Sequence, residues 1–227
     1  LAFIHDFSQY EASIGVDLAA IDAFGDALRD SGKPFVIASG VAAERKGDLA
    51  TEDDPPHPLF PRATAARTTL ALADRGVRSS VVRLPPSVHG RGDKGFVPTL
   101  VETARLRGSS GYVGEGMNRW PAVHREDAAR LFGIAVERAA PGSVLHAVGD
   151  EGIPTRSIAE VIGRHLALPA VSVPAQEVGE HFGWIGGFFS LDVAASNELT
   201  RARFGWQPTG PGLIADLDEG HYFEPPA

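Results

Sequence analysis

Helices alternate in this sequence with short, nearly all-apolar strands, and this alternation constrains the fold more than any other feature. One helix is predicted by apolar residues that recur every three or four positions, namely Ile14, Leu18, Ile21, Phe24 and Leu28. Gly32 ends that helix, and Pro34–Ala38 then reads as a short buried strand. Val77–Leu84 is a second buried strand, rich in β-branched residues. Such an order is typical of a parallel sheet with helices on both faces, so we predict a doubly wound α/β fold.

The alternation continues as far as residue 150. Further helices are predicted over residues 63–75, 97–107, 126–139 and 156–167. A further strand is predicted over Val144–Val148. Beyond residue 150 the strands fade and small helices dominate, with Pro169–Pro174 as a connecting stretch. We therefore expect a sheet domain over residues 1–150 and a smaller, mostly helical lobe over residues 151–227.

Composition excludes several classes of protein. The chain has 227 residues, 43% of them hydrophobic, and a mean hydropathy of −0.06, which describes a globular chain able to bury a core. No apolar run approaches the roughly 18 residues of a membrane span, and we expect a cytoplasmic protein that does not bind membranes. The absence of Cys excludes disulfides and thiolate metal sites. The net charge of −8 disfavours nucleic acid as the main partner.

Two histidines occupy positions of chemical interest. His89 and His124 each end a strand-like run, at the sheet edge where α/β folds bind ligands. None of the eight His residues pairs at the His-x-x-x-His spacing of a helical metal site, so no metal is expected. The acidic run Glu52–Asp54 is interpreted as a solvated edge of a loop.

Two glycine-rich segments invite comparison with nucleotide-binding loops. Gly90–Gly95 matches Gly-x-Gly-x-x-Gly, follows a strand and precedes a helix. Pro85–His89 intervenes, however, whereas the fingerprint needs its first Gly in the turn directly after the strand. We therefore interpret Gly90–Gly95 as a flexible substrate loop, with a dinucleotide site as the alternative. Gly108–Gly114 follows a helix and reads as a turn-rich connector.

Several separate blocks carry a resemblance to a known family. They are Phe35–Gly40, Arg83–Gly90, Trp120–Ala129 and Phe204–Pro208. Together they resemble the extended short-chain dehydrogenase/reductase family, in its NAD-dependent epimerase/dehydratase branch. The matching features are a strand ending in Ser-Gly, a Val-Tyr-Gly strand exit, a Val-His-Val-x-Asp-x-Ala helix start and a Leu-Gly-Trp-x-Pro segment. His89 stands where the family usually has Tyr.

The resemblance implies a Rossmann-type domain that binds NAD or NADP, and a C-terminal lobe that holds a small hydroxy, keto or sugar-like substrate. Carried over position by position, the cofactor-binding candidates are Leu1, Ala2, Phe3, Ser39, Gly40, Arg62, Pro85, Pro86, Ser87 and Val88. Residues 85–120 correspond to the inserted substrate loop. The substrate-binding candidates are His89, Phe96, Asn118, Arg119, Trp120 and His124, with Arg119 matching an Arg that contacts phosphate in sugar-nucleotide members. A homodimer through the helices over residues 13–31 and 63–75 is also implied.

Two features depart from the family pattern. The catalytic Tyr-x-x-x-Lys pair is absent, because Tyr10, Tyr112 and Tyr222 are followed four residues later by Ile, Gly and Pro. Arg62 falls near the Lys position of that pair. In addition, Leu1–Phe3 resembles the end of the family's fourth strand, so we expect this sequence to lack the N-terminal Gly-rich nucleotide-binding segment.

These observations lead to two hypotheses from different classes. In the first, the protein is an NAD(P)-dependent oxidoreductase or epimerase in which Ser39 orients the substrate oxygen and His89 or His124 transfers a proton near neutral pH. In the second, the missing Tyr-x-x-x-Lys pair marks a non-catalytic NAD(P)-binding regulator or scaffold. Turnover of a substrate distinguishes the two.

Overall fold

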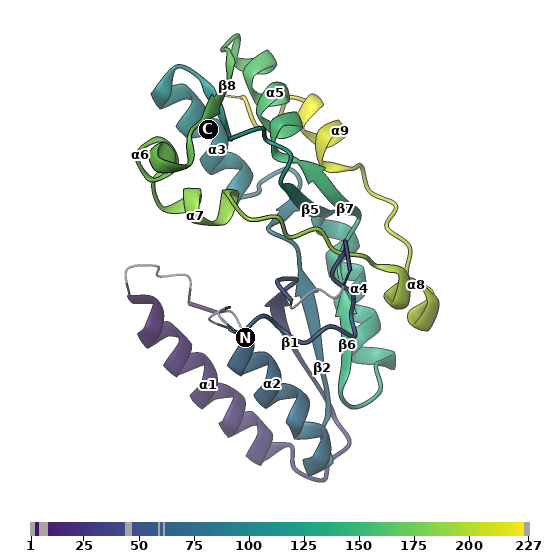
Figure 1. The fold of residues 1–227 in the computed structure, drawn as a ribbon. Helices are drawn as coiled ribbons and strands as arrows, with labels where there is room; N and C mark the ends of the chain where they lie inside the picture. The colour runs from purple at the N-terminus through teal and green to yellow at the C-terminus, as the bar shows by residue number, and fades with distance from the viewer. Residues whose placement is uncertain (1–2, 5–8, 44–46, 59, 61, 225–227) are drawn as a thin grey trace. The chain divides into compact units, whose positions relative to one another are not determined.

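The computed structural model describes residues 3–4, 9–43, 47–58, 60 and 62–224, and the chain divides into two compact units (Figure 1). Unit 1 comprises residues 1–84, 129–147 and 197–207. Unit 2 comprises residues 85–128, 148–196 and 208–227. Each unit is therefore assembled from three separate stretches of sequence. The functional division into a cofactor domain and a substrate lobe stays a prediction.

Unit 1 is built on a three-stranded parallel sheet in the order β1-β2-β6. Its strands are β1 (Pro34–Gly40), β2 (Arg78–Leu84) and β6 (Ser143–His146). Its helices are α1 (Tyr10–Ala27), α2 (Ala63–Ala71) with the 3-10 turn η2 (Leu72–Arg75), most of α4 (Arg125–Arg138), and α8 (Glu198–Phe204). Helices α1 and α2 lie side by side, and α2 packs on β1 and β2 (Figure 1).

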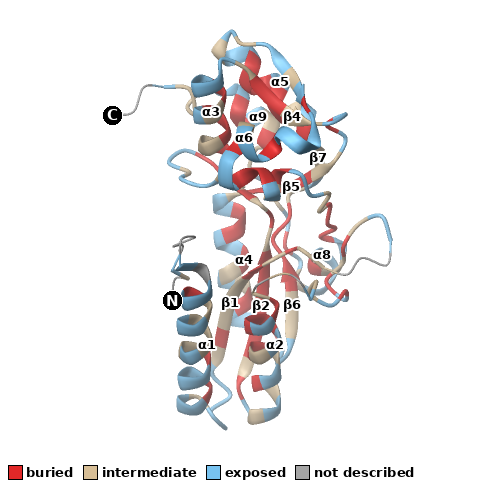
Figure 2. Cartoon of the chain, turned by 60° about the vertical axis from the view of Figure 1, so that its left-hand side comes forward, coloured by how far each residue is buried: buried red, intermediate tan, exposed pale blue. Residues whose placement is uncertain are grey.

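The core of unit 1 follows from the predicted apolar pattern. Buried side chains from α1, β1, α2, η2 and the start of β2 pack together: Ile21, Phe35, Ala65, Leu72 and Val77. Figure 2 shows the buried residues of α1 and α2 turned toward the strands. Gly76 ends the second helix in the left-handed conformation, with φ of 71°. The predicted helices over 14–28 and 63–75 and the two predicted strands are thereby confirmed.

Unit 2 contains two small sheets. In the first, β3 (Ser87–His89) pairs in parallel with β5 (Arg119–His124), which pairs antiparallel with β7 (Asp150–Pro154). In the second, β4 (Ser110–Val113) pairs in parallel with β8 (Ala170–Val173). The longer helices are α3 (Phe96–Arg107) and α5 (Thr155–Leu166). The short ones are η3 (Ala175–Glu177), α6 (Val178–Phe182), η4 (Gly183–Ile185), α7 (Gly186–Phe189) and α9 (Leu213–Asp218).

The core of unit 2 is aromatic and aliphatic. Trp120 is fully buried and meets the ring of Phe189 edge to face, with ring centroids 4.9 Å apart. Ile158 and Ile162 of α5 and Leu213 of α9 complete the same cluster. Within the part of the chain that the structure describes, no helix is both long and apolar enough to span a membrane.

The structure corrects the prediction for two segments of unit 2. Gly108–Gly114, interpreted as a connector, contains β4, and the stretch Pro169–Pro174 contains β8. Ser110 pairs with Ala170 and Val113 with Val173, so β4 and β8 together form a two-stranded parallel sheet. Neither segment shows a long apolar run, because each strand is only four residues long and has one neighbour. Strand β7, five residues long and paired with β5, shows no long apolar run either and is likewise absent from the prediction.

The acidic run is also corrected. Glu52 and Asp54 are buried, with 3% and 5% of their surface exposed, and only Asp53 is exposed as predicted. The Glu52 Oε1 atom accepts hydrogen bonds from the Thr200 backbone N–H at 2.7 Å and its hydroxyl at 2.5 Å. Asp54 accepts the Thr51 N–H at 2.8 Å. The run is therefore not a solvated loop edge, because the Glu52 and Asp54 carboxylates accept hydrogen bonds from donors inside unit 1.

A buried arginine lies near these carboxylates. Burial lowers the pKa of the Arg83 guanidinium below its ordinary value. The nearby Asp54 and Glu52 carboxylates counteract only part of this decrease. Its Nη1 lies 3.3 Å from His146 Nε2 in the neighbouring strand. The cluster ties the loop over 51–54 and α8 to β2 and β6, so it connects parts of unit 1 that are distant in sequence.

We expect Thr200→Val to destabilise the protein by about 1–3 kcal/mol, because the hydroxyl serves two buried groups. It donates to Glu52 and accepts the His146 backbone N–H at 2.8 Å. The matched control is Thr64→Val on the exposed side of α2, for which the expected change is within about 0.5 kcal/mol. Urea unfolding measures both, and equal effects of the two changes would contradict the assigned role of Glu52.

Candidate functional site

A cluster of titratable side chains lies in unit 2, around Asp216. His89 ends β3 and is fully buried, and its Nδ1 lies 2.8 Å from Asp216 Oδ2 on α9. His221, just beyond α9, places Nε2 at 3.0 Å from Asp216 Oδ1. A carboxylate only accepts hydrogen bonds, so the proton sits on Nδ1 of His89 and on Nε2 of His221. Both oxygens of Asp216 are therefore engaged by imidazoles.

The two imidazoles determine the charge state of Asp216. Burial alone raises the pKa of this carboxyl group, but the hydrogen bonds from His221 and His89 outweigh that effect and hold it below the ordinary value. The carboxylate thus stays ionised although its side chain is 3% exposed. An ionised Asp beside a His fixes the tautomer and the orientation of the ring.

His124 ends β5 directly beside His89. The strand register pairs the two residues, and their rings lie edge to face with centroids 5.6 Å apart. Within the described residues, His89 Nε2 and His124 Nδ1 are buried nitrogens without a hydrogen-bond partner. His124 is partly exposed, whereas His89 is fully buried. The pair therefore combines a fully buried imidazole bonded to Asp216 with a partly exposed one.

The segment that leads into α9 is fixed by two more carboxylates. Asp127, at the start of α4, accepts the N–H groups of Thr209 at 3.0 Å and Gly210 at 2.8 Å. Asp150, at the start of β7, accepts the Leu213 N–H at 2.8 Å. A side chain at Gly210 would stand 2.7 Å from the Cβ of His124, so only glycine permits this approach. These bonds set the position of Asp216 against the ends of β3 and β5.

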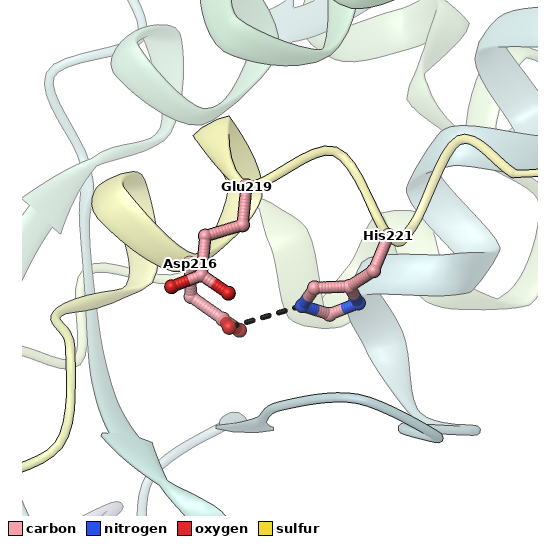
Figure 3. Close-up of side chains that lie close together, drawn as sticks. All are labelled: Asp216, Glu219 and His221. Atoms are coloured by element: carbon pink, nitrogen blue, oxygen red, sulfur yellow. Dashed lines mark hydrogen bonds and ion pairs between the residues drawn. The ribbon is translucent and has the colours of Figure 1, made fainter.

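The same region brings together three potential metal ligands, Asp216, Glu219 and His221, which Figure 3 shows. His221 Nε2 carries the proton that it donates to Asp216, so this nitrogen has no lone pair available for a cation. A metal ion would have to displace that bond before it could coordinate both residues. The arrangement is that of a hydrogen-bonded network rather than an open coordination set.

The predicted cofactor residues of unit 1 lie around the carboxyl end of β1. Ser39 is buried, and its hydroxyl has no hydrogen-bond partner among the described residues. A side chain at Gly40 would stand 2.7 Å from the Phe60 ring. Arg62 pairs with Asp17 of α1 at 3.1 Å and lies over the Phe3 ring at 4.3 Å. Leu1 and Ala2 lie outside the described residues.

The remaining predicted cofactor residues belong to unit 2. Pro85 and Pro86 lead into β3, and Ser87 and Val88 are its first two residues. Ser87 is buried, and its hydroxyl has no partner within the described residues. Their role in binding a cofactor stays a prediction.

The predicted substrate residues other than the histidines are engaged within unit 2. Arg119 forms a two-point ion pair with Asp192, at 3.0 and 2.9 Å. Asn118 donates to the carbonyl oxygens of Phe189 and Leu191 at 2.8 and 3.2 Å. Phe96 packs on Trp120, with ring centroids 5.5 Å apart. These contacts place Asn118, Arg119 and Trp120 in the framework of unit 2, and their contact with a substrate stays a prediction.

Three residues that complete the cluster were not predicted as site residues: Asp216, His221 and Tyr222. They follow His89 by more than 120 positions, and no spacing rule connects them to it. The one available signal was the Asp-Leu-Asp-Glu-Gly-His-Tyr run near the end of the sequence, which concentrates acid–base side chains within seven residues.

Comparison with known proteins places the chain in a family. No protein-family model matches it. It is 46% identical over 224 residues to the Schizosaccharomyces pombe protein called uncharacterized protein C2A9.02, which covers 98% of this chain and 76% of that protein. It is 42% identical over 219 residues to uncharacterized protein YLL056C of Saccharomyces cerevisiae, covering 96% and 74%. The chain belongs to the family of these two yeast proteins.

Solved structures establish the fold class. MoeE5 in complex with UDP-glucose and NAD matches with a TM-score of 0.71 and 20% identity, over 96% of this chain and 73% of that one. WbmG of Bordetella bronchiseptica, in complex with NAD and UDP, matches with a TM-score of 0.73 and 14% identity, over 98% and 70%. At these identities the likeness concerns the fold, and it confirms the predicted Rossmann-type α/β class.

We expect the loss of stability in Asp216→Asn to depend on pH. The pKa of Asp216 is lowered on folding, so its carboxylate stabilises the folded protein above a pH of about 3.8, and this contribution disappears as the pH falls through the folded-state pKa. The variant should lose about 1–3 kcal/mol near pH 5 and clearly less near pH 3. Urea unfolding at both pH values measures this, with Asp22→Asn on exposed α1 as the control. An equal loss at both would contradict the assigned network.

Proposed function

We propose that this protein is an NAD(P)-dependent oxidoreductase, of the epimerase or dehydratase kind, that acts on a small hydroxy, keto or sugar-like substrate. One observation carries the proposal: His89 is held by the buried carboxylate of Asp216, and the partly exposed His124 lies beside it. Two structures of similar fold support it, because MoeE5 is in complex with NAD and UDP-glucose, and WbmG with NAD and UDP.

The chemistry assigned to the histidines is proton transfer. Oxidation of a hydroxyl group to a carbonyl removes a hydride from carbon and a proton from oxygen, and the bound nicotinamide supplies the site that accepts the hydride. An imidazole with an available lone pair removes the proton near neutral pH. His124 is the group within reach of a substrate, and the neighbouring His89 is oriented by Asp216. This pair takes the place of the missing Tyr-x-x-x-Lys.

Residues of unit 1 fit a bound nicotinamide cofactor. Ser39 offers a buried hydroxyl without a partner among the described residues, at the carboxyl end of a strand in a parallel sheet. This is the edge where α/β sheets bind nucleotides. Gly40 keeps the adjoining backbone free of a side chain. We assign Ser39 and Gly40 to cofactor binding.

A second candidate function is a non-catalytic NAD(P)-binding regulator. The sequence favours it in one respect, since none of the three Tyr residues has a Lys four positions later. Cofactor binding by the intact protein, without oxidation or reduction across a panel of hydroxy and keto compounds, would support this candidate. Turnover of any member of the panel would exclude it.

We expect the double variant His89→Gln, His124→Gln to lose about 10²–10⁴-fold in kcat/KM on the best substrate of that panel, with the Kd for NADH and NADPH unchanged. Gln at position 89 keeps a donor for Asp216, so the fold should persist. The matched control is His181→Gln on α6, which lies outside the cluster and should keep wild-type turnover. Unchanged kcat/KM in the double variant would contradict the assigned proton transfer.

A further inference from the structure

The segment after α9 runs back over the loop that follows β3. We call residues 220–224 the C-terminal strap and residues 90–95 the glycine loop. Tyr222 of the strap accepts the Gly90 backbone N–H at 2.9 Å, and its hydroxyl lies 3.1 Å from Asp93 Oδ2. One phenol therefore bridges the first residue of the glycine loop and a carboxylate three positions further on.

Gly90 is a constrained position in this loop. Its φ of 136° disfavours any residue with a side chain. A Cβ there would stand 3.0 Å from His124 Nε2 and 3.2 Å from Arg125, so the backbone passes directly against His124. The neighbouring residue on the other side is His89. A shift of Gly90 would consequently move backbone that adjoins His89 in the chain and lies against the His124 ring.

Asp93 locks the other part of the loop. Its Oδ1 accepts the Gly95 N–H at 2.6 Å, just before α3 begins, and the Asp93 N–H donates to the Gly90 carbonyl at 2.9 Å. Burial raises the pKa of the Asp93 carboxyl group, although the hydrogen bonds from Gly95 and Tyr222 lower it. The Tyr222 hydroxyl thus donates a hydrogen bond to Oδ2 of the half-buried Asp93 carboxyl group.

The strap has its own anchors on two helices. The Phe223 ring stacks on His165 of α5, with centroids 4.4 Å apart and the planes within 4°. Arg105 of α3 donates to the Phe223 carbonyl at 3.0 Å. Asp218, where the strap departs, pairs with Arg164 and His165 of α5. The strap is therefore held on α3 and α5 by contacts that do not involve the glycine loop, in addition to the exposed ion pair of Glu224 with Arg91 at 3.3 Å.

We propose that Tyr222 is a positioning residue: it fixes the glycine loop through Gly90 and Asp93, and so holds that loop in place beside His89 and His124. The part that concerns a substrate rests on the proposed function, since the loop corresponds to the predicted substrate loop. The part that concerns the order of the loop does not depend on any activity.

The test is Tyr222→Phe, which removes only the hydroxyl and keeps the packed ring. Amide hydrogen exchange of Gly90 and Asp93, followed by NMR, should accelerate about five- to tenfold, as expected for the loss of one or two hydrogen bonds. KM for the substrate should rise several-fold, with a smaller change in kcat. Tyr112→Phe in β4 is the matched control and should leave exchange in the glycine loop and KM unchanged.

A double-mutant cycle with Asp93→Asn identifies the partner. If Tyr222 acts through Asp93, the second change should add less in the Tyr222→Phe background than in the wild type. Unchanged exchange at Gly90 in Tyr222→Phe would overturn the proposal, whether or not the protein has an activity. Faster exchange with an unchanged KM would overturn its substrate part alone. If the wild type turns over no substrate, the proposed function fails, and the exchange measurement still decides whether Tyr222 holds the loop.

Discussion

Carboxylates, four of them buried and Asp150 partly buried, hold irregular segments of the described chain in place. In unit 2, Asp127 and Asp150 accept backbone N–H groups from the segment before α9, and Asp216 accepts two imidazoles. In unit 1, Glu52 and Asp54 do the same for α8 and for the loop over 51–54. Where the donor is buried, as for the Thr200 N–H and the His89 ring, loss of its acceptor would cost about 1–3 kcal/mol.

The candidate site is a consequence of this arrangement. Strands β3 and β5 end side by side in parallel, which brings His89 next to His124. The carboxylates on α4 and β7 then place α9 so that Asp216 stands behind His89. The C-terminal strap completes the site by bonding Tyr222 to the backbone just past His89. In this chain, which has no Tyr-x-x-x-Lys, the pairing of β3 with β5 and the buried carboxylate of Asp216 together fix the position of the His89 ring.

The sequence predicts the parts that depend on local pattern. Periodicity predicts α1, α2, β1 and β2, and the placement of His89 and His124 at strand ends agrees with the register that pairs them. Their role as a site stays a prediction. The sequence does not predict β4 and β8, since four-residue strands acquire their structure only from each other. It missed Asp216 and Tyr222 for a related reason, because their roles arise from contacts across more than 120 residues. Glu52 was misjudged as exposed because nothing in an acidic run reveals the donors of Thr200 that face it.

The tautomer of His89 tests the central claim most directly. Long-range proton–nitrogen NMR spectra of the intact protein, recorded at a pH where the ring is neutral, report which nitrogen carries the proton. The account predicts that the proton is on Nδ1, directed at Asp216, and that Nε2 carries the lone pair. It also predicts that this preference is lost in Asp216→Ala. A neutral His89 with its proton on Nε2 would contradict the account, because Nδ1 would then have no proton to donate to Asp216.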